Sequence, residues 1–375
     1  MTNNPATDSQ GSQPTPIILP AQIFAKLSPH AYLSTHLNST KGPHRPSGRK
    51  PSQSRPPACH TGSLSHANGS AVVRCGDTAV VCGIRAEILK VDDVVDYTPK
   101  IPTAEGGDEN ETSGFEPEHR RRRRRDDAEE MARLNLLVPN IELATGCSPA
   151  HLPGGPPSPL AQTLTQRILT LLHTSQLISM DDLRIWSQPA SPAQSILKST
   201  TEMEVDEAEL ASKPQVKAFW TLYISLLFLS LSGPAFDPAW FALLAALKTT
   251  RLPKAWYDTD SDQVLCSPLL SESKLFPLDE DDITVPLSFG VFYDVSEGKD
   301  KKQASKGGRR WILADLDGFE EGLCREEGIV VVRGQGRVVE IKKNGGTGVG
   351  RGEMSALVRL AGVRREEWMS VFRGL

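Results

Sequence analysis

The chain has 375 residues, 38% of them hydrophobic, and its formal net charge is −4. This length exceeds one domain of common size and falls short of three. The chain has no overall excess of basic residues, which excludes nucleic-acid binding driven by net positive charge. Residues 1–17 are polar and contain several prolines, which predicts a disordered N-terminus without a secretory signal. The six cysteines form no Cys-x-x-Cys pair, which predicts free intracellular thiols rather than a disulfide framework.

The first half of the chain combines helix and strand patterns. Residues 18–37 predict a short amphipathic helix, because their apolar side chains recur at helical spacing. Residues 69–87 give the clearest β signal, with two β-rich runs that meet at a tight turn around Gly76. An amphipathic helix is expected over 159–176, since a serine cap and a proline precede its apolar stripe.

The second half begins with the longest apolar run, Phe219–Leu231. This run predicts a strand buried on both faces and is too short to cross a bilayer. Asp237 and Pro238 open a very apolar helix over 239–248, again by a cap followed by proline. The other expected elements are strands at 136–143, 287–293 and 311–316, a hairpin over 329–341 and a helix over 353–372. Together they predict an α+β fold in which helices pack on mixed β-sheets.

Two segments lack a regular apolar pattern. Residues 98–134 hold acidic, glycine-rich and arginine-rich blocks, and residues 188–215 are polar. We expect both to be disordered insertions, because neither has enough patterned apolar residues to offset the entropy of ordering. The sequence therefore predicts a single domain over 18–375 that is interrupted twice.

Several motifs resemble a known family. Arg45-Pro46-Ser47-Gly48-Arg49 is similar to the early Arg-Pro-Asp-Gly-Arg signature of the ribonuclease PH family, with serine in place of aspartate. Residues 69–83 are similar to the first hairpin of that family. Residues 138–158 and 241–248 resemble, more narrowly, the ribonuclease PH-like ring subunits of the eukaryotic RNA exosome. The resemblance covers about residues 20–375, apart from the two insertions.

The resemblance carries implications for fold, partners and function. It implies a ribonuclease PH-like fold with the topology of ribosomal protein S5 domain 2. The implied partners are other ribonuclease PH-like exosome subunits, in an obligate heterodimer within a six-member ring, RNA-binding cap subunits, an associated hydrolytic nuclease and RNA, with no membrane. The implied function is 3′-to-5′ RNA processing and degradation, including rRNA maturation and mRNA turnover, in the nucleus, nucleolus and cytoplasm. No cofactor is expected.

Active members of that family hold phosphate at a helix N-terminus with Gly-Ser-Arg and grip RNA with arginines on the preceding helix. The corresponding helix of this chain opens with Asp237-Pro238-Ala239-Trp240-Phe241, where proline lacks an N–H donor and an aromatic pair cannot bind phosphate. Residues 156–162 contain no arginine where the active relatives carry them. We therefore expect a non-catalytic structural subunit of the ring and not an enzyme.

A group of acidic residues follows the expected strand at 311–316. Asp315 and Glu321 are degenerate candidates for catalytic carboxylates, because active relatives keep their acids near this position. We favour a solvated acidic turn that also includes Asp317 and Glu320, since acids without a phosphate site cannot run phosphorolysis. Two alternatives stay open: an active phosphorolytic 3′-to-5′ exoribonuclease that uses these acids with a partner's phosphate site, and a free RNA-binding protein outside any complex.

The basic residues give a weaker signal. The candidate RNA contacts are Arg45, Arg49, Arg120, Arg121 and Arg122. The run that begins at Arg120 is also typical of a nuclear import signal, or of a solvated segment neutralised by the acids that follow it. Cys59, His60 and His66 match no common zinc spacing and lack a fourth ligand, so no metal is expected.

Overall fold

The structure is a computed structural model, and it describes residues 19–40, 42–95, 97, 118–149, 151, 158–187, 215–258, 261–294, 309–345 and 349–375. The chain forms two compact units, Met1–Pro51 with Tyr293–Trp311, and Ser52–Phe292 with Ile312–Leu375. The single domain over 18–375 stays a prediction, and the smaller unit joins the N-terminal segment to a distant part of the chain. The disorder predicted for residues 1–17, 98–117 and 188–214 falls outside the described residues.

The smaller unit contains two short helices where we predicted one. They are α1 (Ala21–Leu27) and α2 (Pro29–Leu37). The break follows from Pro29, which lacks the N–H of a helix interior and takes the first position of α2 instead. Side chains of α2 form hydrogen bonds with Tyr293 and Asp294, which ties the helix to this distant segment of the same unit.

The larger unit contains a mixed sheet with the strand order β1-β2-β3-β6-β4, and β5 also pairs with β6. Its strands are β1 (Pro57–Thr61), β2 (Gly69–Cys75), β3 (Thr78–Lys90), β4 (Leu137–Leu143), β5 (Arg184–Trp186) and β6 (Val216–Ser230). β4 runs parallel to β6, and the other pairs are antiparallel. The predicted hairpin is formed by β2 and β3, which turn at Gly76, where φ is +60° and favours glycine.

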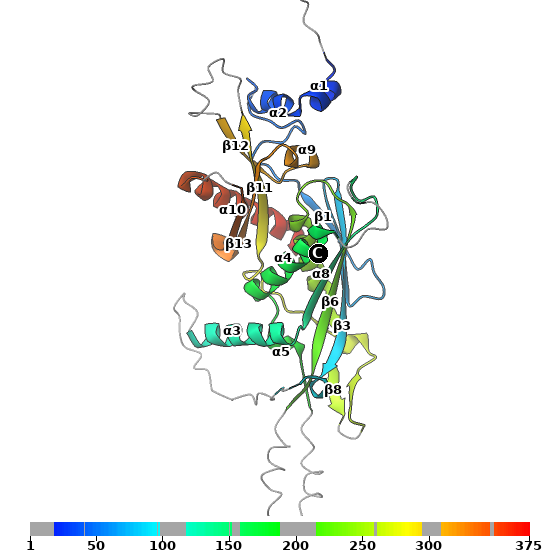
Figure 1. The fold of residues 1–375 in the computed structure, drawn as a ribbon. Coiled ribbons are helices and arrows are strands. Elements are labelled where there is room, and N and C mark those ends of the chain that lie inside the picture. The colour runs from blue at the N-terminus through cyan, green and yellow to red at the C-terminus, as the bar shows by residue number, and fades with distance from the viewer. Residues whose placement is uncertain are drawn as a thin grey trace, which may run out of the picture. The chain divides into compact units, whose positions relative to one another are not determined.

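Two helices cover one face of this sheet, as Figure 1 shows. They are α4 (Pro159–Ser175) and α8 (Phe236–Thr249), and both were predicted from their apolar stripes. Ser158 caps α4 as expected, since its side chain accepts a hydrogen bond from the backbone N–H of Ala161 at 3.1 Å. The core of the unit therefore lies between the sheet and these helices.

The central strand β6 is not buried on both faces as we predicted. Ile224, Leu226 and Phe228 lie in the core, but Tyr223, Leu227 and Leu229 are 36–50% exposed. Successive side chains of a strand point to opposite faces, so the second set lies on the uncovered face of the sheet. The apolar character of both faces misled the prediction, because the helices pack on only one of them.

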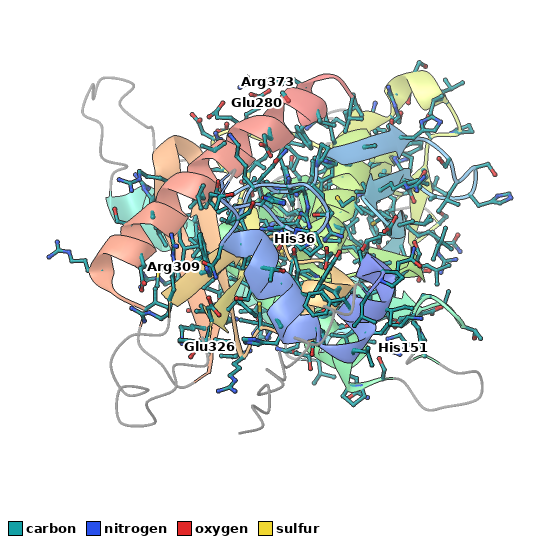
Figure 2. The ribbon with its side chains drawn as sticks, turned by 90° about the horizontal axis from the view of Figure 1, so that it is seen from above. His36, His151, Glu280, Arg309, Glu326 and Arg373 are labelled. Atoms are coloured by element: carbon teal, nitrogen blue, oxygen red, sulfur yellow. The ribbon has the colours of Figure 1, made fainter. Side chains whose placement is uncertain are left out.

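A second sheet has the strand order β12-β11-β13-β14. Its strands are β11 (Val285–Asp294), β12 (Arg309–Ala314), β13 (Glu326–Arg333) and β14 (Arg337–Asn344), which confirms the two predicted strands and the hairpin. The predicted C-terminal helix is α10 (Arg351–Arg373), which packs on β13. Its Trp368 is buried 4.7 Å from the ring of Phe241 in α8, and its Arg373 pairs with Glu280 at 2.9 Å (Figure 2).

Part of the insertion predicted over 98–134 is helical. The structure has α3 (Glu118–Arg133) here, which corrects the expectation of disorder for these residues. Arg184 of β5 explains the order, because its guanidinium lies 3.3 Å from Asp127 and 3.0 Å from Glu130 of α3. No local sequence pattern indicates this partner, which lies more than fifty residues further along the chain.

The remaining elements are short. They are α5 (Met180–Leu183), α9 (Gly318–Glu321), β7 (Arg251–Leu252), β8 (Ala255–Asp258), β9 (Gln263–Cys266), β10 (Lys274–Leu275) and single 3-10 turns at Val91–Asp93, Leu270–Glu272 and Gly334–Gly336. Within the described ranges, no helix combines the length and apolar character that a membrane crossing needs. The predicted α+β class, with helices on mixed sheets, is confirmed.

Candidate functional site

The first turn of α8 is closed by its own side chains. Asp237 is only 2% exposed, and its carboxylate accepts hydrogen bonds from the backbone N–H and the hydroxyl of Ser288, at 3.0 and 2.7 Å. Trp240 is fully buried and donates its indole N–H to the carbonyl of Thr284 at 2.8 Å. The start of the helix therefore faces the core. This is the position at which we predicted that the phosphate site of active relatives is missing.

Burial also changes the pKa of the Asp237 carboxyl in this turn. Desolvation of the carboxylate raises the pKa of Asp237 to about 6, although the two hydrogen bonds from Ser288 oppose the shift. The charge of Asp315 raises this pKa further, and that of Arg364 lowers it. An anion at the start of α8 would meet a carboxylate that is largely ionised at neutral pH.

A small cavity of about 100 Å³ adjoins this turn. It is lined by Leu160, Leu164, Arg167, Pro234, Ala235, Phe236, Ser288, Phe289, Leu316, Glu321, Glu327, Gly328, Ile329, Lys342 and Asn344. Two cations and two carboxylates face it, and burial together with the charge of Glu327 raises the pKa of Glu321. Pockets that enclose a ligand of nucleotide size measure roughly 300–1,000 Å³, so this cavity is too small for a nucleotide.

Asp315, the first candidate for a catalytic carboxylate, lies in a buried ion pair. It is 3% exposed and accepts hydrogen bonds from the backbone N–H of Arg55 at 2.6 Å and from the Arg55 guanidinium at 2.7 Å. Burial favours the neutral form of Asp315, but the hydrogen bonds and charge of Arg55 outweigh it and lower the pKa of the carboxyl. This carboxylate holds distant segments of the chain together and does not line the small cavity beside α8.

Arg55 is the centre of this buried network. Its guanidinium also donates to the backbone carbonyls of Ser232 at 2.8 Å and Leu316 at 3.1 Å. The guanidinium of Arg364, which is 2% exposed, donates to the backbone carbonyl of Arg55. The network joins segments that are up to 309 residues apart in the sequence, so it is a feature of the tertiary structure alone.

The other acids near Asp315 form a helix cap and not the solvated turn that we expected. Asp317 accepts hydrogen bonds from the backbone N–H groups of Phe319 and Glu320, and the Glu320 side chain accepts one from the N–H of Asp317. This reciprocal pattern is a capping box for α9, and Glu320 is fully buried. Asp315 and Glu320 are buried and Asp317 and Glu321 are half-buried, so the turn is less solvated than we predicted. Glu321 alone of the two candidates faces a cavity.

The arginines proposed as RNA contacts have different environments. Arg45 is fully buried and donates to the carbonyl of Pro51 at 2.6 Å, so its side chain is not available to RNA within this chain. Arg49 is half-buried and donates to the hydroxyl of Ser47 at 3.2 Å. Arg120, Arg121 and Arg122 belong to α3, but their side chains lie outside the described residues. In the part of the chain that the structure describes, no cluster of three or more His, Cys, Asp or Glu is placed to hold a metal ion.

Sequence reasoning missed Arg55, Ser288 and Arg364. Arg364 carries a usable signal, because it falls on the buried stripe of α10 between Leu357, Ala361 and Trp368. A charged residue on an apolar helix face is buried only with partners, so its position predicts an internal hydrogen-bond network. Arg55 and Ser288 carry no comparable signal in the sequence.

Residues 53–253 match a protein-family model described as 3′ exoribonuclease family, domain 1, and they make up more than half of the chain. The chain belongs to the 3′ exoribonuclease family. A relative in this family, the exosome complex component rrp43 of Schizosaccharomyces pombe, is 30% identical over 325 residues. The match covers 87% of this chain and 88% of that protein. The resemblance seen in the motifs is therefore confirmed.

Solved structures show that the family fold extends over most of the chain. A chain of the Archaeoglobus fulgidus exosome with RNA bound to the active site matches with a TM-score of 0.56 at 17% identity, over 93% of this chain and 99% of that chain. A chain of an archaeal exosome core matches with a TM-score of 0.52 at 16% identity, over 94% of this chain and 100% of that one. The ribonuclease PH-like fold predicted from the motifs is confirmed.

Proposed function

We propose that this chain is a non-catalytic structural subunit of an RNA exosome ring that supports 3′-to-5′ RNA processing and degradation, including rRNA maturation and mRNA turnover. In this role it pairs with other ribonuclease PH-like subunits, contacts RNA-binding cap subunits and helps to pass RNA to an associated hydrolytic nuclease. The nucleus, nucleolus and cytoplasm are the proposed locations. The similarity to an exosome component over most of the chain supports the assignment to this assembly.

The closed first turn of α8 is the observation that carries the non-catalytic part of the proposal. A phosphate bound at a helix N-terminus needs free N–H donors and a favourable field. Here the second residue of the helix places a carboxylate on Ser288, and proline follows it without an N–H. Phosphate binding would require a buried anion beside an existing one, which is strongly unfavourable in a low-dielectric site.

The alternative of an active phosphorolytic exoribonuclease depends on Asp315 and Glu321 as free carboxylates. Asp315 is held by Arg55 within the protein, and moving it toward a substrate would leave a buried guanidinium without its counter-ion. Glu321 lines the small cavity together with Glu327, but Asp315, the other acid of the candidate pair, does not line it. The described geometry therefore favours a structural role.

The uncovered face of the mixed sheet supports pairing with another subunit. Tyr223, Leu227 and Leu229 lie on this face, and β3 adds Val81 opposite Leu227. Contiguous apolar patches are uncommon on monomeric proteins and mark interaction surfaces. Each subunit of a ring needs such a surface, because burial of apolar area between neighbouring subunits drives stable association.

Co-expression of the full chain with a ribonuclease PH-like exosome subunit of the same organism tests both parts. We expect a stable heterodimer by size-exclusion chromatography with light scattering, and its loss on Leu227→Asp. The control, Leu270→Asp, changes a leucine that is 73% exposed on a 3-10 turn and should leave the heterodimer intact. The heterodimer should release no nucleoside diphosphates from RNA when inorganic phosphate is added.

Phosphate-dependent release that is abolished by Glu321→Gln would overturn the non-catalytic proposal. Glu321 suits this test better than Asp315, because replacing Asp315 also breaks the buried ion pair and confounds activity with stability. A full chain that stays monomeric with every ribonuclease PH-like subunit tried would overturn the assignment to a ring.

A further inference from the structure

Asparagine is followed directly by glycine at two places in the chain, Asn68-Gly69 and Asn344-Gly345. In this dipeptide the backbone nitrogen of the glycine can attack the asparagine carboxamide with little hindrance, because glycine has no Cβ. Asparagine therefore belongs to the thermolabile residues of proteins. Because one dipeptide occurs in two environments, the structure can distinguish a protected copy from a reactive one.

The first copy is held by the mixed sheet. The Asn68 carboxamide donates a hydrogen bond through Nδ2 to the backbone carbonyl of Arg251 at 3.1 Å. Its Oδ1 accepts a hydrogen bond from the backbone N–H of Ala86 at 2.9 Å. Gly69 is buried and is the first residue of β2, where it pairs with Ile84 of β3. Other contacts therefore fix both the carboxamide and the glycine backbone.

The second copy lies at the end of β14. Asn344 is the last residue of this strand, and both Asn344 and Gly345 are exposed. The pairing of β14 with β13 ends at Asn344, and Gly345 forms a bend with a φ of +118°. Among the described residues, neither the Asn344 carboxamide nor the backbone N–H of Gly345 has a hydrogen-bond partner. Both reacting groups are therefore open to water and are not held by other contacts.

We propose that Asn344 is a site of spontaneous deamidation in the folded protein and that the structure protects Asn68 from the same reaction. The backbone nitrogen of Gly345 attacks Cγ of Asn344, the Cγ–Nδ2 bond breaks, and ammonia leaves with the proton of the attacking N–H. Water then opens the resulting succinimide at either of its carbonyl carbons, which gives aspartate or isoaspartate. The reaction consumes only water, and the proposal does not depend on the proposed ring function.

The reaction changes the charge of the small cavity beside α8. The polar residues that line this cavity include Asn344, the acids Glu321 and Glu327, and the cations Arg167 and Lys342. Glu327 is also the direct cross-strand neighbour of Asn344 in the ladder of β13 and β14. A new carboxylate at Asn344 places like charges opposite each other, which destabilises a pair of strands. Deamidation therefore weakens the end of this ladder and adds a third acid to the cavity.

Peptide mass spectrometry of the full chain measures the reaction at both asparagines. The protein is kept at mildly alkaline pH and body temperature in heavy-oxygen water and is then digested in ordinary water, so that only carboxylates formed before digestion carry the label. We expect labelled carboxylate to form at least tenfold faster at Asn344 than at Asn68, with isoaspartate among the products. In the chain unfolded by guanidinium chloride the two rates should become similar, because the sheet no longer protects Asn68.

Two variants complete the test. Asn344→Gln keeps the carboxamide but adds a methylene between it and the backbone, so it should stop isoaspartate formation here and leave the urea midpoint unchanged. Asn344→Asp carries the charge of the product and should unfold at a lower urea concentration than Asn344→Gln at neutral pH. Equal rates at the two asparagines of the folded protein, or no conversion at Asn344 while the unfolded chain reacts, would overturn the proposal. Equal urea midpoints for the two variants would overturn the inferred effect on the ladder.

Discussion

Asp237→Asn should make the unfolding free energy of the protein less sensitive to a rise in pH from 5 to 8. The carboxyl of Asp237 is buried at the start of α8, where it accepts hydrogen bonds from the backbone N–H and the hydroxyl of Ser288. Asparagine preserves the size of the side chain and can still accept one hydrogen bond through its oxygen. It cannot ionise, so it removes the cost of keeping a charge in the core.

The expected size follows from the pKa of Asp237. Burial raises this pKa from 3.8 to about 6, so the folded state holds the proton more tightly than the unfolded state. The stability that protonated Asp237 contributes is therefore complete below pH 4 and is lost as the pH rises through 6. Between pH 5 and pH 8 the loss amounts to about 1.4 kcal/mol in the native protein, and the variant does not undergo it.

Urea denaturation of both proteins at pH 5, 6, 7 and 8 measures the effect. The unfolding free energy of the variant minus that of the native protein should become more positive by about 1.4 kcal/mol from pH 5 to pH 8. Asp126→Asn, which changes an exposed aspartate, should give a curve parallel to the native one. A difference for Asp237→Asn that stays constant with pH, or moves the other way, would refute the reasoning about this buried carboxyl.

Two further substitutions test contacts that hold distant segments together. Arg55→Ala leaves the buried Asp315 carboxylate without its partner and should lower the unfolding free energy by about 3–5 kcal/mol in urea; a loss below 1 kcal/mol would mean that the pair has little structural role. Arg184→Ala should release α3 and speed trypsin cleavage at Arg123–Arg125, while the mixed sheet stays resistant; an unchanged cleavage rate would show that other contacts hold α3.

Periodicity predicted the main elements of this fold because most of them have one apolar face. The hairpin of β2 and β3, the helix α4 and the helix α10 all follow from spacing, caps or turn residues that act within a few residues of each other. The strand β6 is the exception, since both of its faces are apolar and only one packs on helices. Sequence alone cannot distinguish an apolar face that meets the core from an apolar face that stays exposed in the single chain.

The candidate site was only partly accessible to the same reasoning. The residues at 237–241 predicted a poor phosphate site, and the structure places Asp237 and Trp240 in the core. The fate of Asp315 could not be foreseen, because its partner Arg55 lies 260 residues away and no local pattern connects them. The helix α3 was missed for the same reason, since Arg184 fixes it from another element.

The contact between Arg364 and Arg55 has a consequence for folding during synthesis on the ribosome. Synthesis at about 5–20 residues per second separates these two residues by roughly 15–60 seconds, since they are 309 positions apart. Until α10 has been made, the ring of Phe241 lacks the cover of Trp368, and the Arg55 carbonyl lacks its donor. A nascent chain that stalls before α10 emerges therefore presents an incomplete core to chaperones and proteases, whatever the state of its earlier sheet.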